Sequence, residues 1–256
     1  MRSESLKKAY EQIKHEEKLD FETTKESQVE LTVSAAASLQ DALNALKTTY
    51  KKEHSNVKIT YNFGGSGALQ QQISQGAPVD LFFSAAEDKF DQLVDEGLIE
   101  ESQGVDLLAN ELVLVVPKEN EAGIESFEDL TKADKVALGT PESVPAGQYG
   151  VETLKSLNVW DSVESKVVYG KDVKQVLTYV ETGNVDAGIV YRTDALVSEK
   201  ATIAAVADDA SHTPIIYPVG VIKDSKNAEE ANAFYQFLQS DEAMEVYKSF
   251  GFKETK

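Results

Sequence analysis

Cysteine is absent from the 256-residue chain. This absence excludes disulfide bonds, thiolate metal ligands, catalytic cysteines and cofactors attached through sulfur. Histidine is rare, and His15, His54 and His212 lie too far apart in the sequence to have the spacing of a metal-binding pair. No apolar run approaches the roughly 18–20 residues of a membrane-spanning helix. The sequence therefore points away from thiol chemistry, from histidine-bound metals and from a chain that crosses a membrane.

Positive charge is also scarce. The chain has 25 Lys and Arg residues against 44 Asp and Glu residues, which gives a formal net charge of -19. Such a balance argues against nucleic acid or an anionic membrane surface as the main partner. The hydrophobic fraction of 41% is sufficient for a sizeable core, and the length fits one large domain or two small ones.

Motifs for catalysis are missing as well. The sequence has no GxSxG nucleophile elbow, and no spacing pairs two carboxylates for acid–base chemistry. The turn Gly64-Gly-Ser-Gly67 lacks the Lys-Ser/Thr pair of a phosphate-binding loop and the full GxGxxG spacing of a dinucleotide site. We therefore expect a protein that is not an enzyme, with no catalytic residue and no cofactor.

Residues 1–28 form a highly charged leader without an apolar core or a small-residue cleavage site, so they do not resemble a secretory signal. The spacing of Leu6, Tyr10 and Ile13 permits a short amphipathic helix. We expect a solvated tail or short helix, with a regulatory arm as the alternative. The leader is too short for a three-helix DNA-binding module.

From Val29 onward, predicted strands alternate with predicted helices. This rhythm is typical of an α/β fold with parallel sheets covered by helices on both faces. The pattern restarts halfway along the chain, which indicates two lobes joined by apolar extended segments near 108–117 and 215–222. The strands are expected at 30–34, 58–63, 79–83, 111–117, 136–138, 167–169 and 186–191.

Small or hydroxyl-bearing residues recur where a strand passes into a helix. Ser38 follows an alanine run, Ser66 lies in the glycine turn, Ala146 follows Pro145, and Val173 begins a predicted helix. The first N–H groups of a helix lack partners within it, and the helix dipole adds positive potential there. Several such helix starts around one cleft would bind an oxyanion without any charged side chain.

A simpler interpretation stays open at this point. Ser38 and Ser66 can be ordinary helix N-caps, and the glycines can serve only to make a tight turn. Pro145 is equally unremarkable at the first position of a helix.

Five motifs in order resemble the molybdate-binding proteins of bacterial molybdate ABC importers, over about residues 29–254. The motifs are Ala35-Ala-Ala-Ser-Leu39, Phe63-Gly-Gly-Ser-Gly67, Gly76-Ala-Pro-Val-Asp-Leu-Phe-Phe-Ser-Ala85, Pro141-Glu-Ser-Val-Pro-Ala-Gly147 and Gly188-Ile-Val-Tyr191. The resemblance implies a two-lobed type II periplasmic-binding-protein fold, each lobe a mixed, mostly parallel sheet flanked by helices. The expected boundaries are 29–110 with 219–256 for lobe I and 111–218 for lobe II. We also expect one long final helix, from about Ala231 to Tyr247, to return to lobe I.

The resemblance also implies a set of neutral ligand-binding residues. Ser38 and Ser66 would offer hydroxyl and backbone N–H groups, Ala146 and Val173 would offer backbone N–H groups, and Tyr191 would offer its phenolic hydroxyl. Relatives often have a serine-rich stretch at the turn that is Gly64-Gly-Ser-Gly67 here. This departure bears on affinity more than on the identity of the ligand.

A site made only of donors suits molybdate and tungstate, which carry no proton at neutral pH. Hydrogen phosphate would need an acceptor that this set lacks. Sulfate, or another tetrahedral oxyanion, is the alternative ligand, because only cavity size would exclude it. The metal would enter only inside the oxyanion, with no direct bond between molybdenum and the protein.

The resemblance further implies the cellular role. We expect a monomer outside the cytoplasm, either in the periplasm or at the cell surface as a lipoprotein whose signal and anchor cysteine are absent here. Its partners would be the oxyanion and the membrane permease of an ABC importer, with no nucleic acid.

Overall fold

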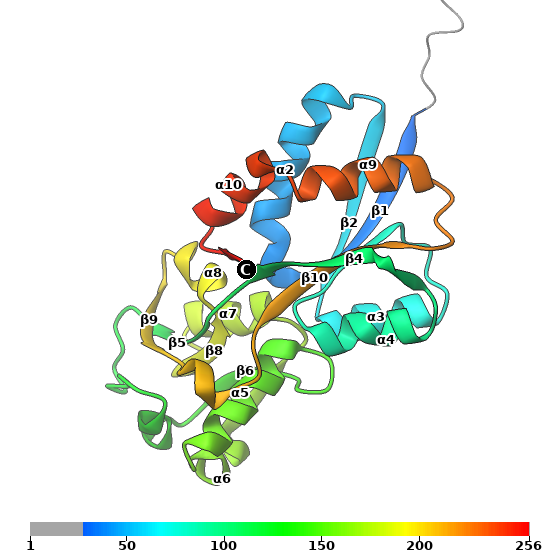
Figure 1. Ribbon diagram of the computed structural model, residues 1–256. Coiled ribbons are helices and arrows are strands. Elements are labelled where there is room, and N and C mark those ends of the chain that lie inside the picture. The colour runs from blue at the N-terminus through cyan, green and yellow to red at the C-terminus, as the bar shows by residue number, and fades with distance from the viewer. Residues whose placement is uncertain (1–27, 256) are drawn as a thin grey trace, which may run out of the picture.

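The computed structural model describes residues 28–255, so the expected leader lies, except for Gln28, outside the described residues. Within the described part, the strands form two sheets, one in each of two lobes (Figure 1). The first sheet has the strand order β11-β4-β10-β3-β1-β2. Its strands are β1 Val29–Ala36, β2 Val57–Gly64, β3 Leu81–Phe83, β4 Ile99–Ala109, β10 Ile216–Ile222 and β11 Lys253–Glu254.

The second sheet has the strand order β7-β6-β8-β5-β9. Its strands are β5 Leu112–Pro117, β6 Val136–Gly139, β7 Val167–Gly170, β8 Ala187–Tyr191 and β9 Ala201–Val206. The chain passes from the first sheet to the second between β4 and β5, and returns between β9 and β10. β10 begins at Ile216, ahead of the lobe boundary expected at 219, and its whole length belongs to the first sheet.

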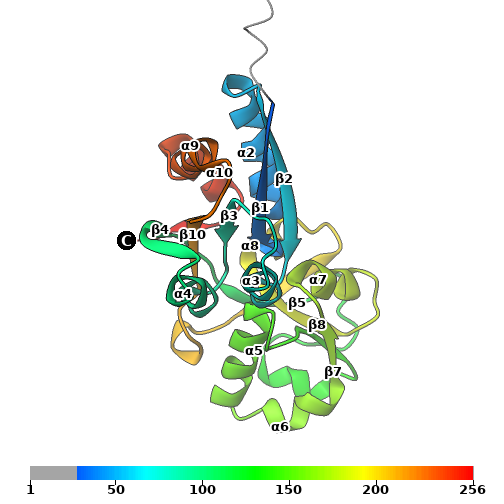
Figure 2. The same ribbon diagram turned by 90° about the vertical axis from the view of Figure 1, so that its right-hand side faces the viewer.

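Helices cover both faces of the sheets (Figure 2). In the first lobe they are α2 Gln40–Glu53, α3 Ser66–Ser74, α4 Glu87–Asp95, α9 Ala228–Leu238 and α10 Asp241–Ser249. In the second lobe they are α5 Pro145–Ser156, α6 Trp160–Val163, α7 Val173–Glu181 and α8 Arg192–Leu196. Short 3₁₀ helices occupy Ala37–Leu39, Glu128–Lys132, Glu164–Lys166 and Asp209–Ser211.

The short strand β3 shows how each face of the first sheet is covered. Successive side chains of a strand point to opposite faces. Phe82 stacks on Phe90 of α4, with ring centroids 6.2 Å apart, while Phe83 meets Tyr247 of α10 on the other face at 6.3 Å. All three residues of β3 are buried, as the apolar run at 79–83 predicts for a strand covered on both sides.

The α/β expectation is confirmed, and the sheets are mixed. β1 pairs in parallel with β2 and β3, whereas β10 pairs antiparallel with β3 and β4. In the second sheet, β6 is parallel to β7 and β8, and β5 is antiparallel to β8 and β9. Among the antiparallel strands, β4, β5, β9 and β10 carry the chain into and out of each lobe.

The expectation of one long C-terminal helix is wrong. The helix α9 ends at Leu238. Ser240 caps a new helix by accepting a hydrogen bond from the backbone N–H of Ala243 at 3.2 Å. The first of the two helices, α9, packs on α2, where the Tyr50 ring lies 4.9 Å from that of Phe234. The two helices therefore pack separately on the first lobe, α9 against α2 and α10 against Phe83 of β3.

Candidate ligand-binding site

The candidate site lies where the carboxyl ends of parallel strands from both lobes face one another. In the first lobe, Ala36 at the end of β1 is in register with Gly64 at the end of β2. In the second lobe, Gly139 and Gly170 end β6 and β7 in register, and α5 and α7 follow these strands. Ligand crevices of open α/β sheets form at such strand ends.

The two lobes touch directly at this point. The backbone N–H of Gly67 donates to the carbonyl of Ser143 across the interface at 3.0 Å. A methyl group on Gly65 would lie 2.5 Å from the same carbonyl oxygen, so only glycine permits this approach. Tyr149 of α5 reaches in the same way to the carbonyl of Ala85 at 3.5 Å. The lobes are thus in a closed arrangement.

A small cavity remains between them, and no charged side chain is among the described residues that line it. It brings together Ser38, Ser66, Val173 and Tyr191 from four separate segments of the chain. Ala146 is not among the lining residues and is fully buried. The wall there is made by its neighbours Val144 and Pro145. The full lining is Ala36, Ala37, Ser38, Gly64, Gly65, Ser66, Ala85, Val144, Pro145, Val173 and Tyr191.

The hydroxyl of Ser38 is not a helix cap. Ser38 lies within the 3₁₀ helix that precedes α2, and no side-chain capping bond is present at either helix start. Its Oγ lies 2.9 Å from the Oη of Tyr217, and both side chains are buried. The capping interpretation is therefore wrong for this residue.

Ser66 is likewise not a cap, because Gly65 occupies the N-cap position of α3. The Oγ of Ser66 accepts a hydrogen bond from the backbone N–H of Ala85 at 2.9 Å. The protein uses one of its two acceptor sites in this way, and its own proton is left to be donated. Val173 begins α7 as expected from the sequence, and Pro145 begins α5.

Tyr191 contributes a buried phenol whose Oη has no hydrogen-bond partner among the described residues. The residue ends β8 and is only 1% exposed. Burial raises its pKa well above the ordinary value, so the phenol is neutral and can donate. A buried polar atom of this kind is costly unless a partner reaches it.

Sequence reasoning missed two polar residues behind Ser38. Asn110 uses its Nδ2 to donate to Tyr217 Oη at 3.1 Å and to Thr193 Oγ1 at 2.9 Å. The available signal was weak: Asn110 is a polar residue between two apolar extended segments, and Tyr217 lies inside another. Ser38, Asn110 and Tyr217 come from three different segments of the chain, so their contact is not visible in any local pattern.

Comparisons with known proteins show the family to which the chain belongs. The family model described as "Bacterial extracellular solute-binding protein" matches residues 31–253. The chain belongs to this family of solute-binding proteins. The family is one of binding proteins rather than enzymes, and its description indicates a location outside the cytoplasm.

Individual relatives extend the comparison. A Bacillus subtilis (strain 168) protein, named as a candidate ABC transporter substrate-binding lipoprotein, YvgL, is 58% identical over 90% of this chain and 88% of its own length. The molybdate-binding protein ModA of Haemophilus influenzae is 38% identical over 87% of this chain and 89% of its own length. The periplasmic molybdate-binding protein of Azotobacter vinelandii has the same fold, with a TM-score of 0.79 at 21% identity over 88% of this chain and 100% of that protein.

Charged residues of this solute-binding protein stand beside the cavity without lining it. Lys174 of α7 lies 2.7 Å from Asp41 of the first lobe and 3.3 Å from Asp194 of the second. Complete burial raises the pKa of Asp194 to about 6, although Lys174 opposes the shift. The positive charge of Lys174 is thus engaged by two carboxylates, one from each lobe.

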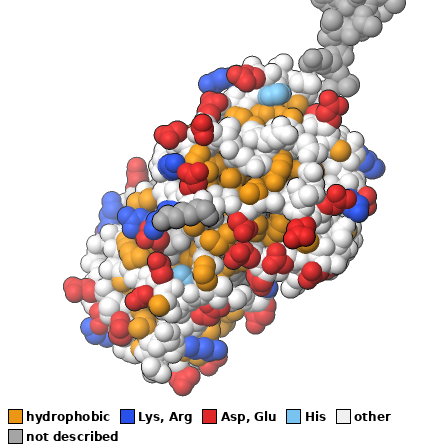
Figure 3. All heavy atoms as spheres, viewed as in Figure 1, with side chains coloured by type: hydrophobic (Ala, Val, Ile, Leu, Met, Phe, Trp, Pro, Cys, Tyr) orange, Lys and Arg blue, Asp and Glu red, His pale blue; other side chains and the backbone are white. Residues whose placement is uncertain are grey.

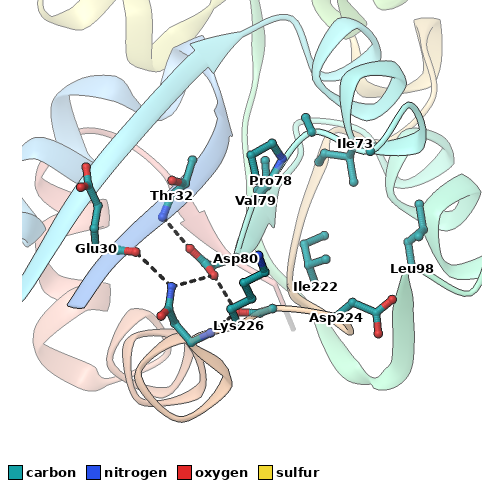
Figure 4. A pocket seen from close by; sticks show the side chains of 14 residues that line it. Glu30, Thr32, Ile73, Pro78, Val79, Asp80, Leu98, Ile222, Asp224 and Lys226 are labelled. Carbon is teal, nitrogen blue, oxygen red and sulfur yellow. Dashed lines mark hydrogen bonds between the residues drawn. The ribbon is translucent and has the colours of Figure 1, made fainter.

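A larger hollow at the opposite end of β1 is shown in Figure 4. Its central carboxylate, Asp80, accepts hydrogen bonds from the Thr32 backbone N–H at 2.7 Å and from the Ser225 hydroxyl at 2.6 Å. Asn227 adds a third bond at 3.3 Å. Asp80 therefore ties β1 to the turn after β10, and the acidic lining does not suit an anion.

Two further findings concern residues 28–255 of this solute-binding protein. In this range, no group of three or more His, Asp or Glu side chains is placed to hold a metal ion. Over the same residues, no helix combines the length and the apolar character that crossing a membrane requires.

Proposed function

We propose that this solute-binding protein captures molybdate, and also tungstate, in the cavity between its lobes. The observation that carries the proposal is the phenol of Tyr191, which is buried and neutral. Among the described residues it has no hydrogen-bond partner, and none of those that line its cavity is charged. Such a cavity suits an anion that only accepts hydrogen bonds. The relatives that are named as molybdate-binding support this choice of ligand.

The proposed donors come from both lobes. Ser38 and Ser66 contribute hydroxyl and backbone N–H groups from the first lobe. Val173 and Ala146 contribute N–H groups from the first turns of α7 and α5, and Tyr191 contributes its hydroxyl. Ala146 is the second residue of α5, where the helix leaves an N–H without an internal partner, and this supports its inclusion although the side chain is not part of the cavity wall.

The overall negative charge of the protein repels an anionic ligand, so hydrogen-bond donors within the cavity must hold it. Acidic side chains are spread over both lobes on the face shown in Figure 3, in keeping with a net charge of -19. Salt screens this field beyond about 10 Å, whereas oriented N–H and O–H dipoles in a closed cavity act at contact distance. A site of this kind can hold a dianion without a cation.

The same chemistry gives the expected selectivity. Hydrogen phosphate carries a proton that would meet only donors, and the resulting unpaired group lowers its affinity strongly. Sulfate accepts on all four oxygens, as molybdate does, so its exclusion depends on the smaller size of the ion.

We further propose that the loaded protein delivers its anion to the permease of an ABC importer, and that it acts as a monomer outside the cytoplasm. The family description and the name of the Bacillus subtilis relative support this role. The two lobes would open and close about the crossings β4–β5 and β9–β10, with residues 216–218 moving with the first lobe because β10 pairs there.

Isothermal titration with molybdate, tungstate, sulfate and phosphate tests the proposal. The wild-type protein should bind the first two anions, and Tyr191→Phe should weaken binding about 10- to 100-fold, the effect of losing one hydrogen bond to an anion. Because the hydroxyl has no hydrogen-bond partner within residues 28–255, this variant should unfold at the same temperature as wild type or slightly higher.

Tyr169→Phe is the matched control, because Tyr169 lies in the second lobe but is 46% exposed. Absence of molybdate binding by the wild type would refute the proposal. Tighter binding of sulfate than of molybdate would identify sulfate as the ligand instead.

A further inference from the structure

A buried chain of hydrogen bonds leads from the first crossing between the lobes to the candidate site. Asn110 Nδ2 lies 3.1 Å from Tyr217 Oη, which lies 2.9 Å from Ser38 Oγ. The three side chains are between 0% and 8% exposed. Of the three, Ser38 alone lines the cavity, so the other two act on it from behind.

The direction of this chain follows from its first bond. The backbone N–H of Glu111 donates to Asn110 Oδ1 at 2.9 Å, which fixes the orientation of the amide, since only its oxygen can accept. The two protons on Nδ2 are then used by Thr193 Oγ1 and Tyr217 Oη.

Tyr217 therefore accepts from Asn110 and has a single proton left to donate. The other hydrogen-bond partner that the structure gives to its hydroxyl is Ser38 Oγ. Ser38 thus accepts from Tyr217, and its own proton is free to point into the cavity. Ser66 is oriented in an analogous way by the Ala85 N–H, so both serine hydroxyls are left as donors.

We propose that Asn110 and Tyr217 are positioning residues that hold the Ser38 hydroxyl as a donor, and so determine the preference for oxyanions without a proton over protonated ones. The inference rests on the proposed function and extends it to residues outside the cavity. If the Tyr217 hydroxyl is removed, the Ser38 hydroxyl is free to rotate. It can then turn a lone pair toward the proton of a protonated oxyanion, at the place where the wild type directs the Ser38 proton.

The first measurement is the ratio of molybdate affinity to hydrogen phosphate affinity for the wild type and Tyr217→Phe. The variant should bind molybdate about tenfold more weakly, and the ratio should fall by the same factor or more, because phosphate affinity stays constant or rises. Tyr247→Phe is the control, since Tyr247 is a fully buried tyrosine of the same lobe whose Oη has no partner in the described structure. It should leave both affinities unchanged.

A double-mutant cycle tests whether Tyr217 acts through Ser38. In a Ser38→Ala background, Tyr217→Phe should cause no further loss of molybdate affinity. If Tyr217→Phe does not fold, Asn110→Ala takes its place, because it removes the donor that orients the phenol and should lower the same ratio.

The outcomes separate the two proposals. A wild type that binds molybdate, together with additive losses in the cycle or an unchanged affinity ratio, overturns the positioning role alone. A wild type that binds no molybdate overturns the proposed function and this inference with it.

Discussion

Asp194 is the residue whose environment departs most from that of a surface carboxylate. It is completely buried, and its carboxylate lies 3.3 Å from the ammonium group of Lys174. Desolvation raises its pKa to about 6, even though Lys174 favours the charged form. Burial also lowers the pKa of Lys174, but Asp194 and Asp41 outweigh it, so the net shift is upward.

This shift predicts a pH dependence of stability. In the folded protein Asp194 binds a proton below about pH 6, whereas in the unfolded chain it does so only below about pH 4. The folded state holds more protons in this window, so the contribution of Asp194 to the free energy of unfolding falls as the pH rises from about 4 to 6. The change amounts to at most about 3 kcal/mol.

Urea unfolding at a series of pH values checks this prediction. The difference between wild type and Asp194→Asn should vary across the window. The difference between wild type and Asp161→Asn, a change at an exposed position of α6, should stay flat. A flat difference for both variants would mean that Asp194 keeps an ordinary pKa.

At the scale of elements, the turn from β2 into α3 controls how closely the lobes can approach. Gly65 has φ -68° and ψ 134°, a conformation that alanine adopts without strain. The need for glycine is therefore steric and comes from the opposite lobe. A methyl group there would lie 2.5 Å from the Ser143 carbonyl oxygen and 3.1 Å from that of Lys171.

Gly65→Ala should therefore keep both lobes folded but prevent full closure. We expect at least tenfold weaker molybdate binding and, with ligand present, a larger radius of gyration than wild type in small-angle X-ray scattering. Gln71→Ala is the control, because Gln71 is exposed on the following helix α3 and does not line the cavity. Equal effects of the two substitutions would contradict the steric explanation.

For the whole molecule, Lys174 connects the two lobes through a pair of charges. Its ammonium group contacts Asp41 on α2 and Asp194 on α8, at 2.7 Å and 3.3 Å. The contact with Asp194 lies within one lobe, whereas the contact with Asp41 spans the two lobes and would break as they separate. Asp41 is 40% exposed at its side chain, so solvent limits the strength of this second contact.

Asp41→Asn should therefore speed the release of bound molybdate modestly, about two- to fivefold, without lowering the unfolding temperature. Stopped-flow displacement measures the rate. Glu254→Gln is the matched control, because Glu254 pairs with Lys248 at 3.0 Å within the first lobe. An identical release rate for wild type and Asp41→Asn would show that this ion pair has no part in closure.

Local sequence patterns were sufficient for the framework of the fold. The alternation at 58–63 and the apolar run at 79–83 predicted β2 and β3, and their parallel pairing with β1 is confirmed. Strand-to-helix junctions were visible at Ser66 and Val173, and the structure brings these residues to one cavity because parallel strands end at the same edge.

Features that depend on distant contacts could not be read in this way. The bond between Ser38 and Tyr217 joins residues 179 positions apart. The first half of β4 carries polar residues such as Glu100 and Glu101, which conceal a strand whose hydrogen bonds come from β10. The break at Ser240 was hidden because apolar spacing continues across it, and only the cap reveals the new helix.

The glycine and alanine lining of the cavity has a consequence for how the protein tolerates mutation. Much of the proposed grip on the anion comes from main-chain amides, and every amino acid except proline supplies one. A change at Val173, or elsewhere in a helix's first turn, to any residue other than proline removes no donor, and it harms the site only by adding bulk. Substitutions at these positions should therefore change the rates of lobe opening and closing before they change which ion the protein binds.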